Sequence, residues 1–210
     1  MDVTTTLLFA TTLERLWHVF ADPRYVERKQ HALGAQAVTM RRFVATARRI
    51  EVEHERRVAV AVDAMPPWMR AWFADGQTLR ERTAWCRLGE RRAAIETHID
   101  AVGQPLEIAG AGRFAEPIRG IVFMRVDWRI TSSLPTLGQE LERLFAAQLG
   151  SLLRRDRAFT VCYAAYAASR VAARASQRSG TFDDARRTPR AGLETLLASD
   201  SKGARTIAIE

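Results

Sequence analysis

The sequence has little cysteine: Cys86 and Cys162 are the only two in 210 residues. Two cysteines exclude a disulfide scaffold and a cysteine-rich zinc module. Such supports are not needed, because 47% of the residues are hydrophobic and a chain of this length can bury a sizeable core. We expect both cysteines to be reduced, packed side chains.

The sequence also lacks a long apolar run. Its longest uncharged stretches, 3–13 and 158–169, are well short of the roughly 20 residues that a membrane-spanning helix needs. Asp2 stands where a signal peptide would carry a basic region. The sequence therefore predicts a soluble, cytoplasmic protein.

Lysine is nearly absent, since Lys29 and Lys202 are the only lysines among 32 basic residues, and the net charge is +8. Such a charge can indicate nucleic acid or anionic lipid as a partner. Arginines alternate with acidic residues along most of the chain, as in 80–82, which favours solvated strand faces and makes nucleic acid an unfavoured partner. The exception is 174–210, which reads as a basic, flexible tail.

Motifs for common chemistries are missing as well. The chain has no glycine-rich phosphate loop, no closely spaced pair of histidines or cysteines, and no nucleophilic triad. Gly110 and Gly112 fall within an expected strand, where they indicate a bulge or a bend. His98 has the parity opposite to Ile95 and Ile99, which places it toward solvent and argues against a metal site with His54. We predict neither a metal nor another cofactor.

The first 34 residues predict a strand and two short helices. Residues 3–10 are rich in β-branched and apolar side chains, which is typical of a strand. Thr11 or Thr12 can cap a helix that ends near Phe20, and Asp22 with Pro23 can begin a second helix that Gly34 ends.

From about residue 35 to 131 the apolar period changes to two, which predicts an antiparallel sheet with one dry face. Ile50, Val52 and His54 share that face on one strand, as do Val122 and Met124 on the last strand. The expected strands are 35–47, 49–62, 77–88, 91–100, 104–115 and 119–131.

A long helix follows, because apolar residues keep a period of 3.6 from about 135 to 173. Such a helix is about 55 Å long at 1.5 Å per residue, so it must cross most of one sheet face. We predict an α+β domain over 1–173, in which a curved antiparallel sheet of about seven strands wraps round this helix, and a tail over 174–210.

Two segments carry a resemblance to a known family. Residues 5–26, Thr-Leu-Leu-Phe-Ala followed by Thr-Leu-Glu-Arg-Leu-Trp and Ala-Asp-Pro-Arg-Tyr-Val, resemble the first strand and helix pair of the START-like (SRPBCC, helix-grip) superfamily. Residues 138–159 resemble its closing helix, and the likeness covers about 2–168. More narrowly, the chain is similar to an uncharacterised bacterial branch of that superfamily, known as a domain of unknown function.

This resemblance implies a sheet that grips a helix around an apolar pocket. Members bind lipids, sterols, polyketides or aromatic small molecules; some are cyclases or hydrolases, and others only carry or sense a ligand. The superfamily has no shared catalytic motif, so no catalytic residue is carried over.

Strand parity and helical phase select the candidate pocket residues. His54 on the dry face could bond a ligand hydroxyl or act as a base, or it could be a core histidine bonded to the backbone. Arg56 shares that face and could bind a carboxylate-bearing ligand, unless an edge or a bulge turns it outward. The full set is His54, Arg56, Trp85, Phe114, Met124, Trp128, Phe145 and Leu149.

An aromatic segment between two expected strands, 65–73, includes Trp68 and Trp72. It could form an apolar lid over the pocket, touch a membrane peripherally, or pack into the core.

We predict that the protein binds or transports a hydrophobic small molecule or lipid, with no established catalysis. One alternative is a polyketide-cyclase-like or hydrolase-like enzyme that uses His54 in the same pocket. Another is a module that binds membranes or polyanions through the arginine-rich tail. The sequence leaves the oligomeric state open.

Overall fold

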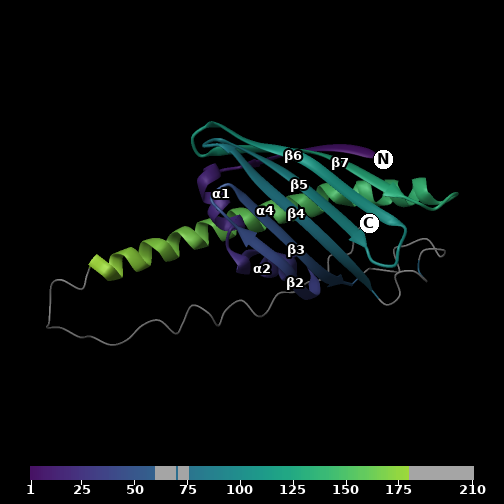
Figure 1. Cartoon of the computed structure of the whole chain (residues 1–210), viewed down its shortest axis with the longest axis horizontal. Helices are drawn as coiled ribbons and strands as arrows, with labels where there is room; N and C mark the ends of the chain where they lie inside the picture. Colours follow the sequence, from purple (N-terminus) through teal and green to yellow (C-terminus); the bar gives the residue numbers. More distant parts are fainter. Residues whose placement is uncertain (60–69, 71–75, 180–210) are drawn as a thin grey trace, which may run out of the picture. The chain divides into compact units, whose positions relative to one another are not determined.

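The computed structural model describes residues 1–59, 70 and 76–179, and the compact unit that holds the sheet is Met1–Arg170 (Figure 1). The aromatic segment with Trp68 and Trp72, and the tail from residue 180 onward, lie outside the described residues. The division of the chain at residue 173 therefore stays a prediction.

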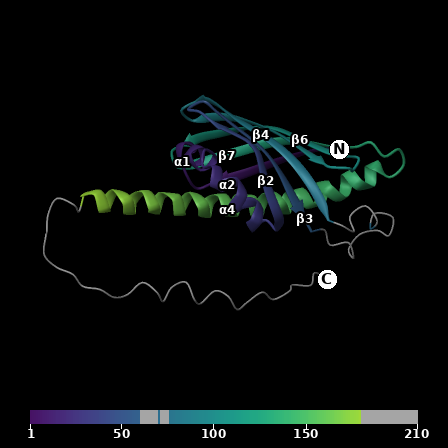
Figure 2. The same ribbon diagram turned by 60° about the horizontal axis from the view of Figure 1, so that its bottom comes forward.

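Seven antiparallel strands form one sheet, in the order β1-β7-β6-β5-β4-β3-β2. The strands curve as a single layer, and α1, α2 and α4 lie on the same side of it (Figure 2). The strands are β1 (Asp2–Phe9), β2 (Ala35–Ala45), β3 (Arg49–Val58), β4 (Gln77–Gly89), β5 (Arg92–Ala101), β6 (Leu106–Ile118) and β7 (Ile121–Ser132).

The two short helices begin where the sequence predicts. In α1 (Leu13–Phe20) the Thr12 side chain accepts a hydrogen bond from the Arg15 amide at 3.2 Å, and in α2 (Pro23–Ala32) Asp22 accepts one from the Arg24 amide at 3.0 Å. Gly34 follows α2 with a φ of 100°, a conformation that glycine adopts without steric cost. Local capping therefore determines both helix starts.

The predicted dry face of the sheet is confirmed. Ile50, Val52, His54 and Arg56 alternate with half-buried glutamates along β3, and the inward residues of β7 are buried in the same way. Side chains of α1, α2 and α4 complete the core on this face. Period-two patterning was enough to find it, because successive strand residues point to opposite faces.

Helix α4 (Gly138–Ser179) is longer than predicted, since it continues to the residue before Gly180. Contacts at three positions along the helix hold it under the sheet. Glu142 binds the Met1 amino group at 2.9 Å, and the Arg157 Nε donates to the Leu8 carbonyl, so both ends of β1 are joined to this helix. Farther along, the Tyr163 hydroxyl donates to Asp22 at 2.7 Å, which joins α4 to the start of α2.

Gly110 and Gly112 make room for side chains and backbone of the neighbouring strands. The pairing of β6 runs through both glycines without a register shift, so the bulge interpretation is wrong. A Cβ at Gly110 would lie 2.7 Å from the Trp128 ring, and one at Gly112 would lie 2.3 Å from the Arg125 carbonyl oxygen. Both positions need glycine because neighbouring groups approach too closely for a side chain.

The expectation for the cysteines is half right. Cys86 is half-buried, whereas Cys162 is exposed, because it falls on the face of α4 that points away from the core. Neither forms a disulfide. In the part of the chain that the structure describes, no helix has the length and apolar character needed to span a membrane.

The architecture is the predicted α+β helix-grip fold. A curved seven-stranded antiparallel sheet, two short helices after the first strand and a long closing helix occur in the predicted order. The function depends on whether the sheet and α4 leave a cavity between them.

Candidate ligand-binding site

A cavity of about 510 Å³ lies between the sheet and α4. Its walls are mainly apolar, with Leu79 and Ile108 from the sheet facing Phe145 and Leu149 from the helix. Exposed residues such as Gln148 also line it, so the cavity reaches solvent beside α4. This volume falls within the roughly 300–1,000 Å³ typical of small-molecule sites.

A second, inner cavity of about 80 Å³ is lined mainly by buried residues of the sheet and helices. Four residues line both cavities: Glu81, Trp128, Leu153 and Asp156. The inner cavity is surrounded by aromatic rings and by hydroxyl groups, among them those of Tyr25, Thr83 and Thr97. The interior therefore offers a large apolar space that adjoins a small polar one.

The structure brings most of the predicted pocket residues to these two cavities. Arg56, Trp128, Phe145 and Leu149 line the larger one. Trp85, Phe114 and Met124, again with Trp128, line the inner one. His54 is buried but lines neither cavity. Contact of any of these residues with a ligand stays a prediction.

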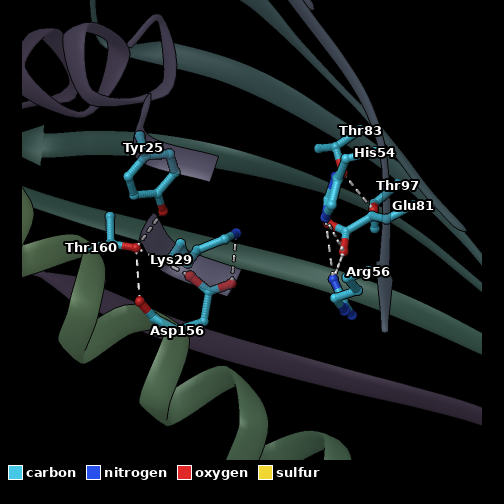
Figure 3. Close-up of polar contacts among 9 residues, drawn as sticks. All are labelled: Tyr25, Lys29, His54, Arg56, Glu81, Thr83, Thr97, Asp156 and Thr160. Atoms are coloured by element: carbon cyan, nitrogen blue, oxygen red, sulfur yellow. Dashed lines mark hydrogen bonds and ion pairs between the residues drawn. The ribbon is translucent and has the colours of Figure 1, made fainter. Parts of the chain in front are cut away.

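A buried polar cluster lies among the residues that line the two cavities, since Glu81 lines both and Arg56 lines the larger one (Figure 3). The Arg56 Nη1 donates to the Glu81 carboxylate, and the same nitrogen lies 3.5 Å from His54 Nε2. Thr83 donates to the other oxygen of Glu81 at 3.3 Å and bonds Thr97 at 2.8 Å. Arg56 thus faces inward, as its strand parity predicts, and is not turned outward by a bulge.

The charges in this cluster set each other's protonation. Burial alone would raise the pKa of Glu81, but Arg56, with His54 and Lys29, lowers it to about 2. Burial lowers the pKa of His54 to about 4; Glu81 opposes this effect, while Arg56 adds to it. At neutral pH the cluster therefore holds an ionised Glu81, a charged Arg56 and a neutral imidazole.

One interpretation of His54 was a core histidine bonded to the backbone, but no backbone partner is found among the described residues. Its Nδ1 is buried and has no hydrogen-bond partner among the described residues, while Nε2 faces Arg56 and lies 3.8 Å from Glu81. The ring is held through side chains of β3 and β4. The strand pattern placed it on the correct face but could not identify these partners.

Two further polar contacts join α2 and α4 across the same interior. Lys29 donates to Asp156 at 3.0 Å, and the hydroxyls of Tyr25 and Thr160 are 2.7 Å apart. Burial alone would lower the pKa of Lys29, but Asp156, Tyr25 and Glu81 together raise it above its ordinary value. Lys29 is therefore a charged group that is neutralised within the protein.

Sequence reasoning missed Glu81, Lys29 and Asp156. One signal was available for Glu81, because it has the same strand parity as Trp85, which was selected. No comparable signal existed for Lys29 and Asp156, whose pairing spans 127 residues of sequence. His98, by contrast, lies on the outer face as predicted, where it contacts Glu107 at 2.5 Å.

The His54 shift predicts a specific loss of stability in acid. The unfolded chain takes up a proton near pH 6.5, whereas folded His54 resists until about pH 4, so the free energy of unfolding falls as pH drops through this window. Glu81 adds a loss of the same sign between about pH 4.5 and 2.

Urea unfolding at several pH values between 7 and 4 checks this expectation. In His54→Gln, the free energy of unfolding should fall by up to about 3 kcal/mol less between pH 7 and 4 than in the wild type. His18→Gln, at an exposed histidine, is the matched control. Equal pH slopes for the wild type and His54→Gln would contradict the role given to His54.

Comparisons with known proteins agree with the architecture. Residues 4–163 match a family model described as "Protein of unknown function (DUF2505)". No curated protein matches the sequence significantly.

Solved structures with the same fold are distant in sequence. TTHA0849 from Thermus thermophilus is 11% identical with a TM-score of 0.51, covering 78% of this chain and 99% of that one. The Zhui aromatase/cyclase from Streptomyces sp. R1128 is 13% identical with a TM-score of 0.52, covering 78% and 93%. The di-domain aromatase/cyclase StfQ of the steffimycin pathway is 12% identical with a TM-score of 0.52, covering 80% and 52%. These similarities confirm the START-like fold.

Proposed function

The chain belongs to the DUF2505 family, whose description assigns no function, and we propose that it binds a hydrophobic small molecule or lipid between the sheet and α4. The observation that carries this proposal is the cavity of about 510 Å³. A cavity of this size with mainly apolar walls and an opening to solvent is typical of a small-molecule site, whereas close packing elsewhere in a protein leaves no such space. A bound apolar molecule would cover these walls.

The polar groups of the cavity favour a ligand with an uncharged oxygen. Arg56 is neutralised by Glu81 and Lys29 by Asp156, so no carboxylate is needed to balance a buried cation. Among the described residues, Arg56 bonds its partners through Nη1. Its Nε and Nη2 are left to donate to a hydroxyl or carbonyl group in the cavity that Arg56 lines.

The structural neighbours support a ring-containing ligand. Two of them are aromatase/cyclases, in which the same fold serves molecules that become cyclic and aromatic. The walls here suit such a molecule, because Trp128 and Phe145 provide flat apolar surfaces. The same cavity would hold the ligand if the protein also transports it.

The enzyme alternative rested on His54 as a base. A general base must come within hydrogen-bond reach of its substrate, and His54 lies behind the cavity wall instead of in it. We therefore favour binding over catalysis by this residue. The alternative that uses the basic tail stays a prediction, as does a cytoplasmic location.

Native mass spectrometry of the protein purified from its own host tests the proposal directly. We expect a retained molecule, which extraction then identifies as hydrophobic with few polar groups. Leu149→Trp, which fills the larger cavity from α4, should abolish retention. Ala147→Trp on the exposed side of the same helix should leave retention unchanged. Equal retention by both variants would contradict the site.

A further inference from the structure

Three hairpin turns lie together at one end of the sheet. The β2–β3, β4–β5 and β6–β7 hairpins are all antiparallel and close through the pairs Ala45–Ile50, Gly89–Arg92 and Ile118–Ile121. Since the strands alternate in direction across one sheet, these turns lie at the same end (Figure 1). We call residues 46–49, 88–92 and 117–120 the hairpin end.

The hairpin end is strongly basic. It carries five exposed arginines and one acidic residue, Glu90. Arg49 is paired with Glu51 at 2.5 Å, and the other arginines are Arg48, Arg91, Arg92 and Arg119. The β5–β6 loop at the opposite end, 102–105, has no charged residue. The excess charge is therefore a local feature and not only a reflection of overall composition.

The hairpin end is also unusually apolar at its tips. Leu88 and Ile118 are 57% and 64% exposed, the highest values among the nine exposed large apolar residues of the described chain. Leu8, Val44 and Phe123 of the same nine lie within three residues of the strand ends there. Isolated exposed apolar residues are ordinary, but five of nine at one end, beside arginines, indicate a binding surface.

We propose that the hairpin end docks on a membrane surface that contains anionic phospholipids. The arginine guanidinium groups bind the headgroup phosphates, and Leu88 and Ile118 enter the interfacial region. Projecting apolar tips distinguish this surface from one built for nucleic acid, because phosphate binding alone does not require them.

The docking surface is separate from the ligand cavity. The cavity is lined by the opposite ends of the strands, including Leu79, Ala101 and Leu106. Docking therefore does not depend on whether the cavity holds a ligand, and each proposal can fail without the other.

Co-sedimentation of the full chain with phosphatidylcholine vesicles, with and without phosphatidylserine, tests the proposal. We expect binding only with phosphatidylserine. Arg92→Ser with Arg119→Ser should weaken it by about 25-fold, at about 5-fold per basic residue. Leu88→Ser with Ile118→Ser should weaken it at least about 10-fold by removing apolar insertion. Thermal unfolding confirms that each variant is folded.

The matched control removes the same charge elsewhere. Arg82 and Arg129 are exposed on the outer face of the sheet, away from the turns. Arg82→Ser with Arg129→Ser should change binding by less than about 3-fold if docking is local. An equal loss in this control, wild-type binding by the tip variants, or no binding by the wild type would overturn the proposal. The proposal would also be overturned if the Leu88 and Ile118 variant bound vesicles as the wild type does and the arginine variant lost affinity for duplex DNA. That combination would indicate a nucleic-acid surface instead of a membrane surface.

Discussion

Arg56→Met will lower the free energy of unfolding by about 3–5 kcal/mol. The substitution removes the charged partner of Glu81, whose side chain is 13% exposed and whose pKa Arg56 holds down. Glu81 would then be either an uncompensated buried charge or a carboxyl group that must take up a proton at neutral pH. Chemical unfolding followed by circular dichroism measures the loss.

Two further variants separate the ion pair from general packing. Arg56→Met with Glu81→Leu should recover most of the stability, because two apolar side chains can replace a buried pair without leaving a charge. Arg82→Met breaks the exposed contact with Glu53, at 3.2 Å, and should cost less than about 1 kcal/mol. Similar losses for Arg56→Met and Arg82→Met would contradict the burial argument.

Gly112→Ala will destabilise the protein by about 3 kcal/mol, although it adds a single methyl group. The new Cβ would lie 2.3 Å from the Arg125 carbonyl oxygen and 2.8 Å from the Val126 Cα. These are backbone atoms of β7, so no side-chain rotation can relieve the clash, and β6 and β7 must move apart. Urea unfolding measures the shift.

Gly89→Ala is the matched control for that substitution. Gly89 ends β4, and a Cβ there would meet nothing within 4 Å. We expect a change within about 0.5 kcal/mol. If Gly112→Ala were as mild as Gly89→Ala, the strands would not be held in the observed register.

Local patterns explain why the elements could be predicted. Thr12, Asp22 and Pro23 set the helix starts through contacts a few residues away. Alternation along β3 and β7 identified the buried face, including the inward position of Arg56. The same reasoning allowed a bulge or a bend at Gly110 and Gly112 but could not find the close contacts there, because the groups that require glycine belong to other strands.

The amino-acid sequence by itself determined the order of strands and helices, the dry face of the sheet and most of the residues around the interior, since each depends on spacing within one element. Only the tertiary structure decided that Glu81 from β4, Lys29 from α2 and Asp156 from α4 meet there. Such contacts join distant segments, and their positions follow from how α4 packs under the curved sheet. The same packing leaves the unfilled space that a ligand would occupy.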